Sequence, residues 1–201
     1  MALRFEHAFV VKAEPDRVWS YLTDPYRVAP ALPGAAITEK VDDVSYGGTI
    51  TVKVGPVSAR YRGTLRFAKL DAAARTAEIV ASGQDTSGRG GADMRMSSRI
   101  VEKAADETEV SVVAEVSVTG IIAQFGRGLM QDVSNQMFQK FTEAIRAELE
   151  GPATAEADAG PKAPAAPIEV VSFGSRILLR QPAFWIAVVA VMLVVFWLWS
   201  R

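Results

Sequence analysis

Cysteine is absent from this sequence, and histidine occurs once, at position 7. The first absence excludes disulfides, thiolate metal sites and cysteine nucleophiles, and the second excludes a pair of histidine ligands. An excess of basic charge is also lacking, because 22 lysine and arginine residues stand against 23 acidic ones. A nucleic-acid role therefore has no support in the composition, and we expect no metal site.

The N-terminus lacks the apolar run of an export signal, since Arg4, Glu6, Lys12 and Glu14 interrupt it. Such a run stands instead at residues 182–199, which carry no charge. As a helix these eighteen residues measure about 27 Å, close to the hydrocarbon thickness of a bilayer. We therefore predict a membrane anchor.

Arginines and tryptophans flank this apolar run. Arg180 precedes it, and Trp185 and Trp199 lie near its ends, where indole rings favour the membrane interface. The alternative is a hydrophobic helix packed inside a soluble protein, which needs neither feature. We expect a transmembrane anchor over residues 176–201, in the cell inner membrane, with the N-terminal domain in the cytoplasm.

Alanine, proline and acidic residues dominate Gly151–Pro167, which has little to bury. Residues 151–175 are predicted to be a linker and juxtamembrane segment. Residues 1–150 are then left as one domain, long enough for a single core.

Apolar and polar residues alternate through most of this domain. Residues 3–11 have the period of two expected for a strand covered on one side, and Pro15 and Pro25 open two short helices. Further strands follow up to Gly120, joined by tight turns, and a long amphipathic helix reaches about Glu150. The predicted class is α+β, with a curved antiparallel sheet of about six or seven strands wrapped on the long helix.

The inward faces of the predicted strands carry no charge and many small residues. Because protein interiors pack to about 0.74 density, small residues under a single covering helix favour a hollow over a filled core. Methionines on the sheet and on the helix together suit a flexible apolar ligand, although each one alone is more typical of ordinary core packing. The candidate ligand-binding residues are Leu22, Leu32, Tyr61, Leu65, Phe67, Ala81, Met94, Met96, Phe125, Leu129, Met130, Val133 and Met137.

Polar groups within the inward set are few. They are His7, Tyr61 and Ser98, and a hydroxyl or imidazole in an apolar site orients the polar end of a ligand. His7 is also consistent with a hydrogen-bonded histidine near a strand end, with no ligand. Arg127, between two glycines at the start of the long helix, is a candidate for the rim of the site.

Several motifs carry a family resemblance. The order of elements is that of the helix-grip fold of START-like and pollen-allergen-like lipid-binding domains. More narrowly, residues 24–28, 32–35, 52–57, 60–63 and the glycine-rich 87–91 resemble the CoxG family of carbon monoxide dehydrogenase subunits over about residues 3–149. The resemblance implies a hydrophobic-ligand domain working beside a molybdenum-containing carbon monoxide dehydrogenase, with no catalytic residues.

Three functions are compatible with these features. The first is a tethered carrier that takes a hydrophobic small molecule from the lipid bilayer and presents it to the dehydrogenase. The expected ligand is a menaquinone or similar isoprenoid quinone, and no covalent cofactor is expected. The second is a membrane anchor or maturation scaffold that carries no ligand. The third is an enzyme, since related folds host cyclases, but no inward acid cluster or metal pair supports it. We expect the first.

Overall fold

The computed structural model describes residues 1–151. The predicted anchor and the linker after Gly151 lie outside the described residues, so these remain predictions. Within residues 1–151, no helix is both long enough and apolar enough to cross a bilayer.

The predicted order of elements is confirmed, with one difference at the start of the long helix. Ile122 lies in a separate 3₁₀ turn, and the helix begins only at Arg127, because Gly126 has an extended backbone and two glycines weaken helix propensity there. The elements are β1 (Ala2–Val11), α1 (Pro15–Leu22), α2 (Pro25–Val28), η1 (Ala29–Ala31), β2 (Ala35–Lys40), β3 (Ser45–Val54), β4 (Val57–Asp71), β5 (Thr76–Asp85), β6 (Gly91–Ala104), β7 (Glu107–Val118), η2 (Ile122–Gln124) and α3 (Arg127–Leu149).

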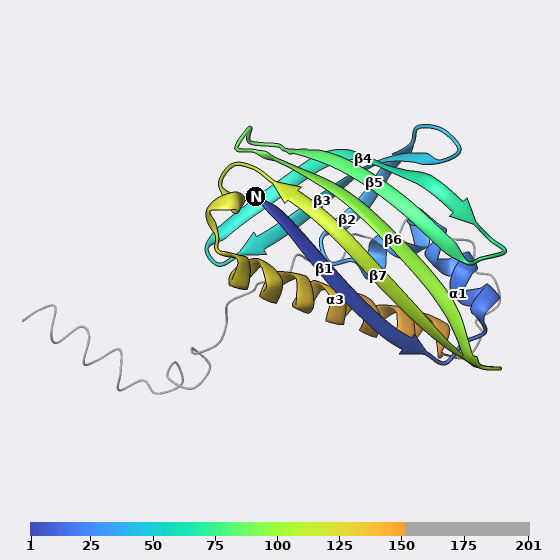
Figure 1. Ribbon diagram of the computed structural model, residues 1–201. Coiled ribbons are helices and arrows are strands. Elements are labelled where there is room, and N and C mark those ends of the chain that lie inside the picture. Colours follow the sequence, from blue (N-terminus) through green and yellow to red (C-terminus); the bar gives the residue numbers. More distant parts are fainter. Residues whose placement is uncertain (152–201) are drawn as a thin grey trace, which may run out of the picture. The chain divides into compact units, whose positions relative to one another are not determined.

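The seven strands form one antiparallel sheet in the order β1-β7-β6-β5-β4-β3-β2. Hairpins join β2 to β7 in sequence, and β1 adds to β7 at the far edge. Figure 1 shows the sheet curling from β1 over to β2 and β3, with α3 along the β1 side. Because side chains alternate along each strand, one set of residues faces the concave side with α3 and the other faces solvent.

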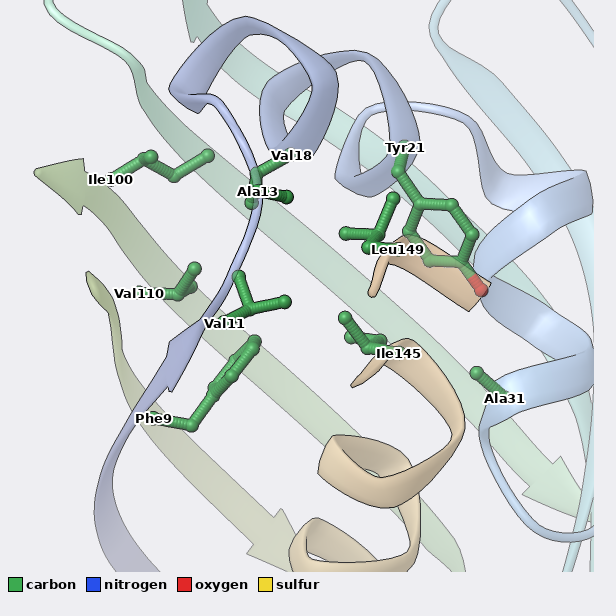
Figure 2. Close-up of a cluster of buried hydrophobic side chains, with 10 residues drawn as sticks. All are labelled: Phe9, Val11, Ala13, Val18, Tyr21, Ala31, Ile100, Val110, Ile145 and Leu149. Carbon is green, nitrogen blue, oxygen red and sulfur yellow. The ribbon is translucent and has the colours of Figure 1, made fainter. Parts of the chain in front are cut away.

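One buried cluster closes the end of the domain where α1 meets the C-terminal end of α3. Figure 2 shows Val11, Ile145 and Leu149 directed into the same space, and all three are at most 1 % exposed. Their complete burial makes this the tightly packed end of the domain. We call it the α1-side cluster, consisting of Phe9, Val11, Ala13, Val18, Tyr21, Ala31, Ile100, Val110, Ile145 and Leu149.

A second buried cluster involves the β3–β4 hairpin, η2 and the N-terminal half of α3. Val54 and Ala59 from this hairpin are fully buried. We call it the hairpin-side cluster, consisting of Leu3, Phe5, Val54, Ala59, Tyr61, Ile122, Met130 and Val133. The domain therefore has two separate packed regions on its concave side.

Hydrogen bonds hold α3 against the edge strand β1. The Arg146 guanidinium donates from Nε and Nη2 to the Val10 carbonyl, at 3.0 and 2.8 Å, and the Lys12 amide donates to the Glu150 carboxylate at 2.9 Å. These contacts satisfy the Val10 carbonyl of β1 and the Lys12 amide just after it, which no strand pairs. The helix is thus fixed at the β1 edge.

Candidate functional site

The strand register brings the predicted sheet residues together on the concave face. Leu65, Ala81 and Met94 are neighbours across β4, β5 and β6. In the next row, Met96 pairs with Ala114 of β7. We call these five residues the central band.

The central band lies outside both buried clusters. Its five side chains face the concave side, yet each is only half-buried, and none belongs to or packs against either cluster. Inward residues of a fully packed core touch many neighbours and lose nearly all their accessible surface. The middle of the concave face therefore presents apolar surface that residues 1–151 cover only in part.

The small inward residues do not all serve the same purpose. Ala59 and Ala77 are buried, so their size fits close packing. At Gly63 a Cβ would lie 1.9 Å from the Ser82 carbonyl oxygen, so glycine is required there for the close approach of β4 and β5. The expectation that every small residue opens space was therefore too broad, whereas Ala81 and Ala114 remain half-buried in the band.

The structure places the thirteen predicted ligand-binding residues in four settings. Tyr61, Met130 and Val133 belong to the hairpin-side cluster, and Phe125, Leu129 and Met137 pack against it. Leu22 packs against the α1-side cluster. Phe67 is buried but belongs to neither cluster. The remaining five are half-buried and belong to neither cluster: Leu32, Leu65, Ala81, Met94 and Met96.

Tyr61 is the polar group most suited to a ligand contact. Its side chain is only 8 % exposed, yet its hydroxyl makes no hydrogen bond within the described residues. Burial raises the pKa of Tyr61, and the nearby Asp85 carboxylate raises it further. The hydroxyl therefore stays protonated at neutral pH and has a hydrogen bond to donate.

Asp85, which sequence reasoning missed, is a buried carboxylate at the end of β5, directly opposite Tyr61. It accepts hydrogen bonds from the Ser87 hydroxyl and from the backbone amides of Ser87 and Arg89. The hydrogen bond from the Ser87 hydroxyl is the main reason that the pKa of Asp85 lies below its usual value. The Asp-x-Ser spacing before the glycines is the signal that predicts this turn.

His7 is hydrogen-bonded, but it lies in the middle of β1 and not near a strand end as predicted. Its Nε2 is 3.1 Å from the Ser134 hydroxyl, and its ring stacks on Phe138 at 4.2 Å between centroids. The imidazole thus links β1 to α3. Burial lowers the pKa of His7, because the charged form loses hydration.

This shift predicts a pH dependence of stability. Unfolded histidine has a pKa of about 6.5, so below that pH the unfolded chain binds more protons than the folded one. The free energy of unfolding should fall as the pH is lowered from about 7 towards 5, and His7→Gln should flatten this dependence. Urea midpoints of both proteins at about pH 7 and pH 5 test this, and equal losses on acidification would contradict it.

Within residues 1–151, no three histidine or acidic side chains gather in a way that could hold a metal ion. The concave face instead offers apolar side chains with an unpaired phenolic hydroxyl at one end. Such a site can bind an apolar molecule and orient its polar end.

Comparison with solved structures identifies the class of fold. A conserved protein from Geobacillus kaustophilus superposes with a TM-score of 0.67 at 17 % identity, over 74 % of this chain and 95 % of the other. The Zhui aromatase/cyclase from Streptomyces sp. R1128 gives 0.57 at 18 % identity, over 75 % and 94 %. A START superfamily protein from Mycobacterium smegmatis gives 0.50 at 14 % identity, over 73 % and 97 %. The described domain has the START-like helix-grip fold, as predicted.

A family model then identifies one family within this class of fold. The model of the carbon monoxide dehydrogenase CoxG family matches residues 8–150. The chain belongs to this family, which confirms the resemblance seen in the motifs. No curated protein matches the chain.

Proposed function

We propose that this protein binds a long apolar molecule against the central band, as a membrane-tethered carrier and not as an enzyme. The observation that carries the proposal is the central band itself, an inward apolar surface that is only half-buried between two packed clusters. Each methylene that a ligand buries there contributes about 0.8 kcal/mol. A chain of several methylenes therefore gains enough to leave water for this face.

We further propose that the ligand is an isoprenoid quinone such as menaquinone. Its tail would lie against Met94, Met96 and the adaptable side chain of Met137, which are half-buried. A quinone carbonyl would accept a hydrogen bond from Tyr61, whose hydroxyl has no partner within the described residues. One polar contact at the end of an apolar site fixes orientation.

The family name supports a carbon monoxide dehydrogenase as the recipient of this quinone. The predicted anchor at residues 176–201 would hold the domain near the bilayer that stores the quinone. The predicted linker would then give a high effective concentration of the domain over that patch of membrane. We propose that the protein also recruits the dehydrogenase to the membrane.

The test is mass spectrometry of lipid extracted from the full chain, purified in detergent from cells that make menaquinone. We expect quinone at close to one equivalent per chain. Ala81→Trp, purified in the same way, is the matched control for quinone that detergent carries along, because its indole fills part of the central band. Equal quinone in both proteins would contradict the proposal, and another apolar molecule enriched only in the wild type would correct the ligand class.

A further inference from the structure

The outward face of β4 carries three arginines that the ligand site does not use. Arg60, Arg62 and Arg66 are all exposed and alternate with inward residues of the strand. We call them the arginine row. At about 3.3 Å per residue, the row extends about 20 Å along the strand.

The neighbouring strands place no acid directly opposite these arginines. On β3, Thr51 faces Arg60 and Thr49 faces Arg62, and on β5 Gln84 faces Arg62. At the end of the row, Arg66 has Ser45 and Val80 as its neighbours. The direct cross-strand partners of the row are therefore uncharged. Two acids lie near the row without forming an ion pair with it: Glu39, whose side chain lies over Gly47 opposite Thr64, and Glu78, which is diagonal to Arg66 on β5.

Several other cations on the same domain have acidic partners. Arg4 lies 2.8 Å from Glu6, and Lys103 lies 3.1 Å from Glu109. None of the three arginines of the row forms an ion pair within the part of the chain that the structure describes. The Arg66 charge helps to lower the pKa of Asp42, after the hydrogen bonds to that carboxylate, but Asp42 forms no ion pair with it. Because the whole chain has a net charge of −1, the row is a local concentration of positive charge.

We propose that the arginine row is the docking surface for an acidic face of the dehydrogenase, an inference that rests on the proposed function for the identity of that partner. The planar guanidinium of arginine binds carboxylates through two parallel hydrogen bonds, which suits a protein surface rich in aspartate and glutamate. Arginine is also enriched in protein interfaces.

A lipid surface fits this row less well than a protein does. Domains that bind bilayers combine cations with apolar side chains that insert between lipids. None of the exposed large apolar residues of the described chain faces an arginine of the row directly, although Val44 lies at its Arg66 end, where the Val44 carbonyl accepts a hydrogen bond from the Phe67 amide. The direct cross-strand partners of the row are mostly threonine, serine and glutamine. Those apolar residues are Tyr26, Val41, Val44, Leu70 and Val101.

Docking at this row places the dehydrogenase behind the strand that carries the proposed ligand contacts. Tyr61 lies between Arg60 and Arg62 in sequence and points to the opposite side of the sheet. The partner is then separated from the quinone site by one layer of sheet. The same strand would thus bind the ligand on one face and the recipient enzyme on the other.

The experiment compares two charge-reversed variants of the full chain in liposomes, with purified carbon monoxide dehydrogenase added and co-sedimentation measured. Arg60→Glu/Arg62→Glu reverses the row, and Arg95→Glu/Arg99→Glu makes the same charge change at exposed outward positions of β6. We expect the first variant to bind the enzyme at least about tenfold more weakly than the wild type, because carboxylates then face carboxylates. The second should bind nearly as the wild type does.

The outcomes separate this inference from the proposed function. Unchanged binding by the row variant, equal loss in both variants, or no binding by the wild type would each overturn the docking surface. A loss seen in liposomes containing phosphatidylglycerol but not in neutral phosphatidylcholine would assign the row to lipid and also overturn it. Quinone content is measured on the same samples. If the row variant loses enzyme binding but retains quinone, the result supports the docking surface. If the row variant loses enzyme binding and the wild type carries no quinone either, the result supports the docking surface and contradicts the proposed carrier function.

Discussion

Ala81→Trp is expected to weaken the binding of a short-tailed menaquinone by at least about tenfold while leaving the fold intact. Ala81 lies at the centre of the central band, between Leu65 and Met94, and is only half-buried. An indole there would occupy surface that two or three ligand methylenes would otherwise cover. Losing those contacts costs about 2 kcal/mol, which corresponds to more than tenfold in the dissociation constant. Equilibrium titration of the detergent-solubilised full chain measures it.

Ser82→Trp is the matched control, because it adds the same side chain at the next residue of β5 but on the exposed outer face. It should bind quinone as the wild type does. Equal affinities for both variants and the wild type would show that the central band does not hold the ligand. If Ala81→Trp recruits as much dehydrogenase to the membrane as the wild type does, recruitment is independent of the ligand. If neither the wild type nor Ala81→Trp carries quinone, the protein is a scaffold.

Gly63→Ala should destabilise the domain by about 3 kcal/mol or more, the largest effect that we expect from adding one methyl group. The added Cβ would lie 1.9 Å from the Ser82 carbonyl oxygen and 2.5 Å from the Gly83 Cα. Backbone atoms cannot turn aside as a flexible side chain can, so β4 and β5 must separate locally. The midpoint of urea unfolding of residues 1–151, followed by the fluorescence of Trp19, measures the change.

Gly83→Ala is the control for this substitution, because Gly83 is the direct cross-strand partner of Gly63. Its Cβ would meet nothing closer than 3.5 Å, an ordinary contact distance. We expect its unfolding free energy to stay within about 1 kcal/mol of the wild type. If both variants lose the same stability, glycine at position 63 is needed for flexibility and not for close approach of the strands.

The proposed functions divide the two faces of the sheet between them. The concave face carries the central band and Tyr61, and the convex face carries the arginine row. Because the side chains of one strand alternate, substitutions at neighbouring positions test the two faces independently. The Ala81 and Arg60/Arg62 variants should therefore affect ligand binding and enzyme binding separately.

Most of the fold follows from local patterns in the sequence. The alternation in residues 3–11 and 110–118 predicts strands that the structure confirms as β1 and β7, and Pro15 and Pro25 do open α1 and α2. Turn chemistry at Gly55 and at residues 87–91 places the hairpins correctly. The start of α3 was less predictable, because helical spacing of apolar residues continues from Ile122 through the extended Gly126.

The candidate site was only partly predictable. Sequence alternation selects the inward residues, but it does not distinguish Ala59, which is fully buried, from Ala81, which is not. Nor does it reveal that Asp85 comes to lie beside Tyr61 or that His7 bonds to Ser134, since these pairs form across strands or between strand and helix. Such contacts depend on register and on where α3 lies.

The sequence by itself determined the class of elements, their order, the family and the residues that face inward, because periodicity, capping and turn residues act over a few positions. Only the tertiary structure decided which inward residues are buried in the two clusters and which are only half-buried in the central band. It also decided that no acid lies directly opposite the arginine row on the adjoining strands. The physical reason is that burial and charge pairing depend on atoms brought together from distant parts of the chain.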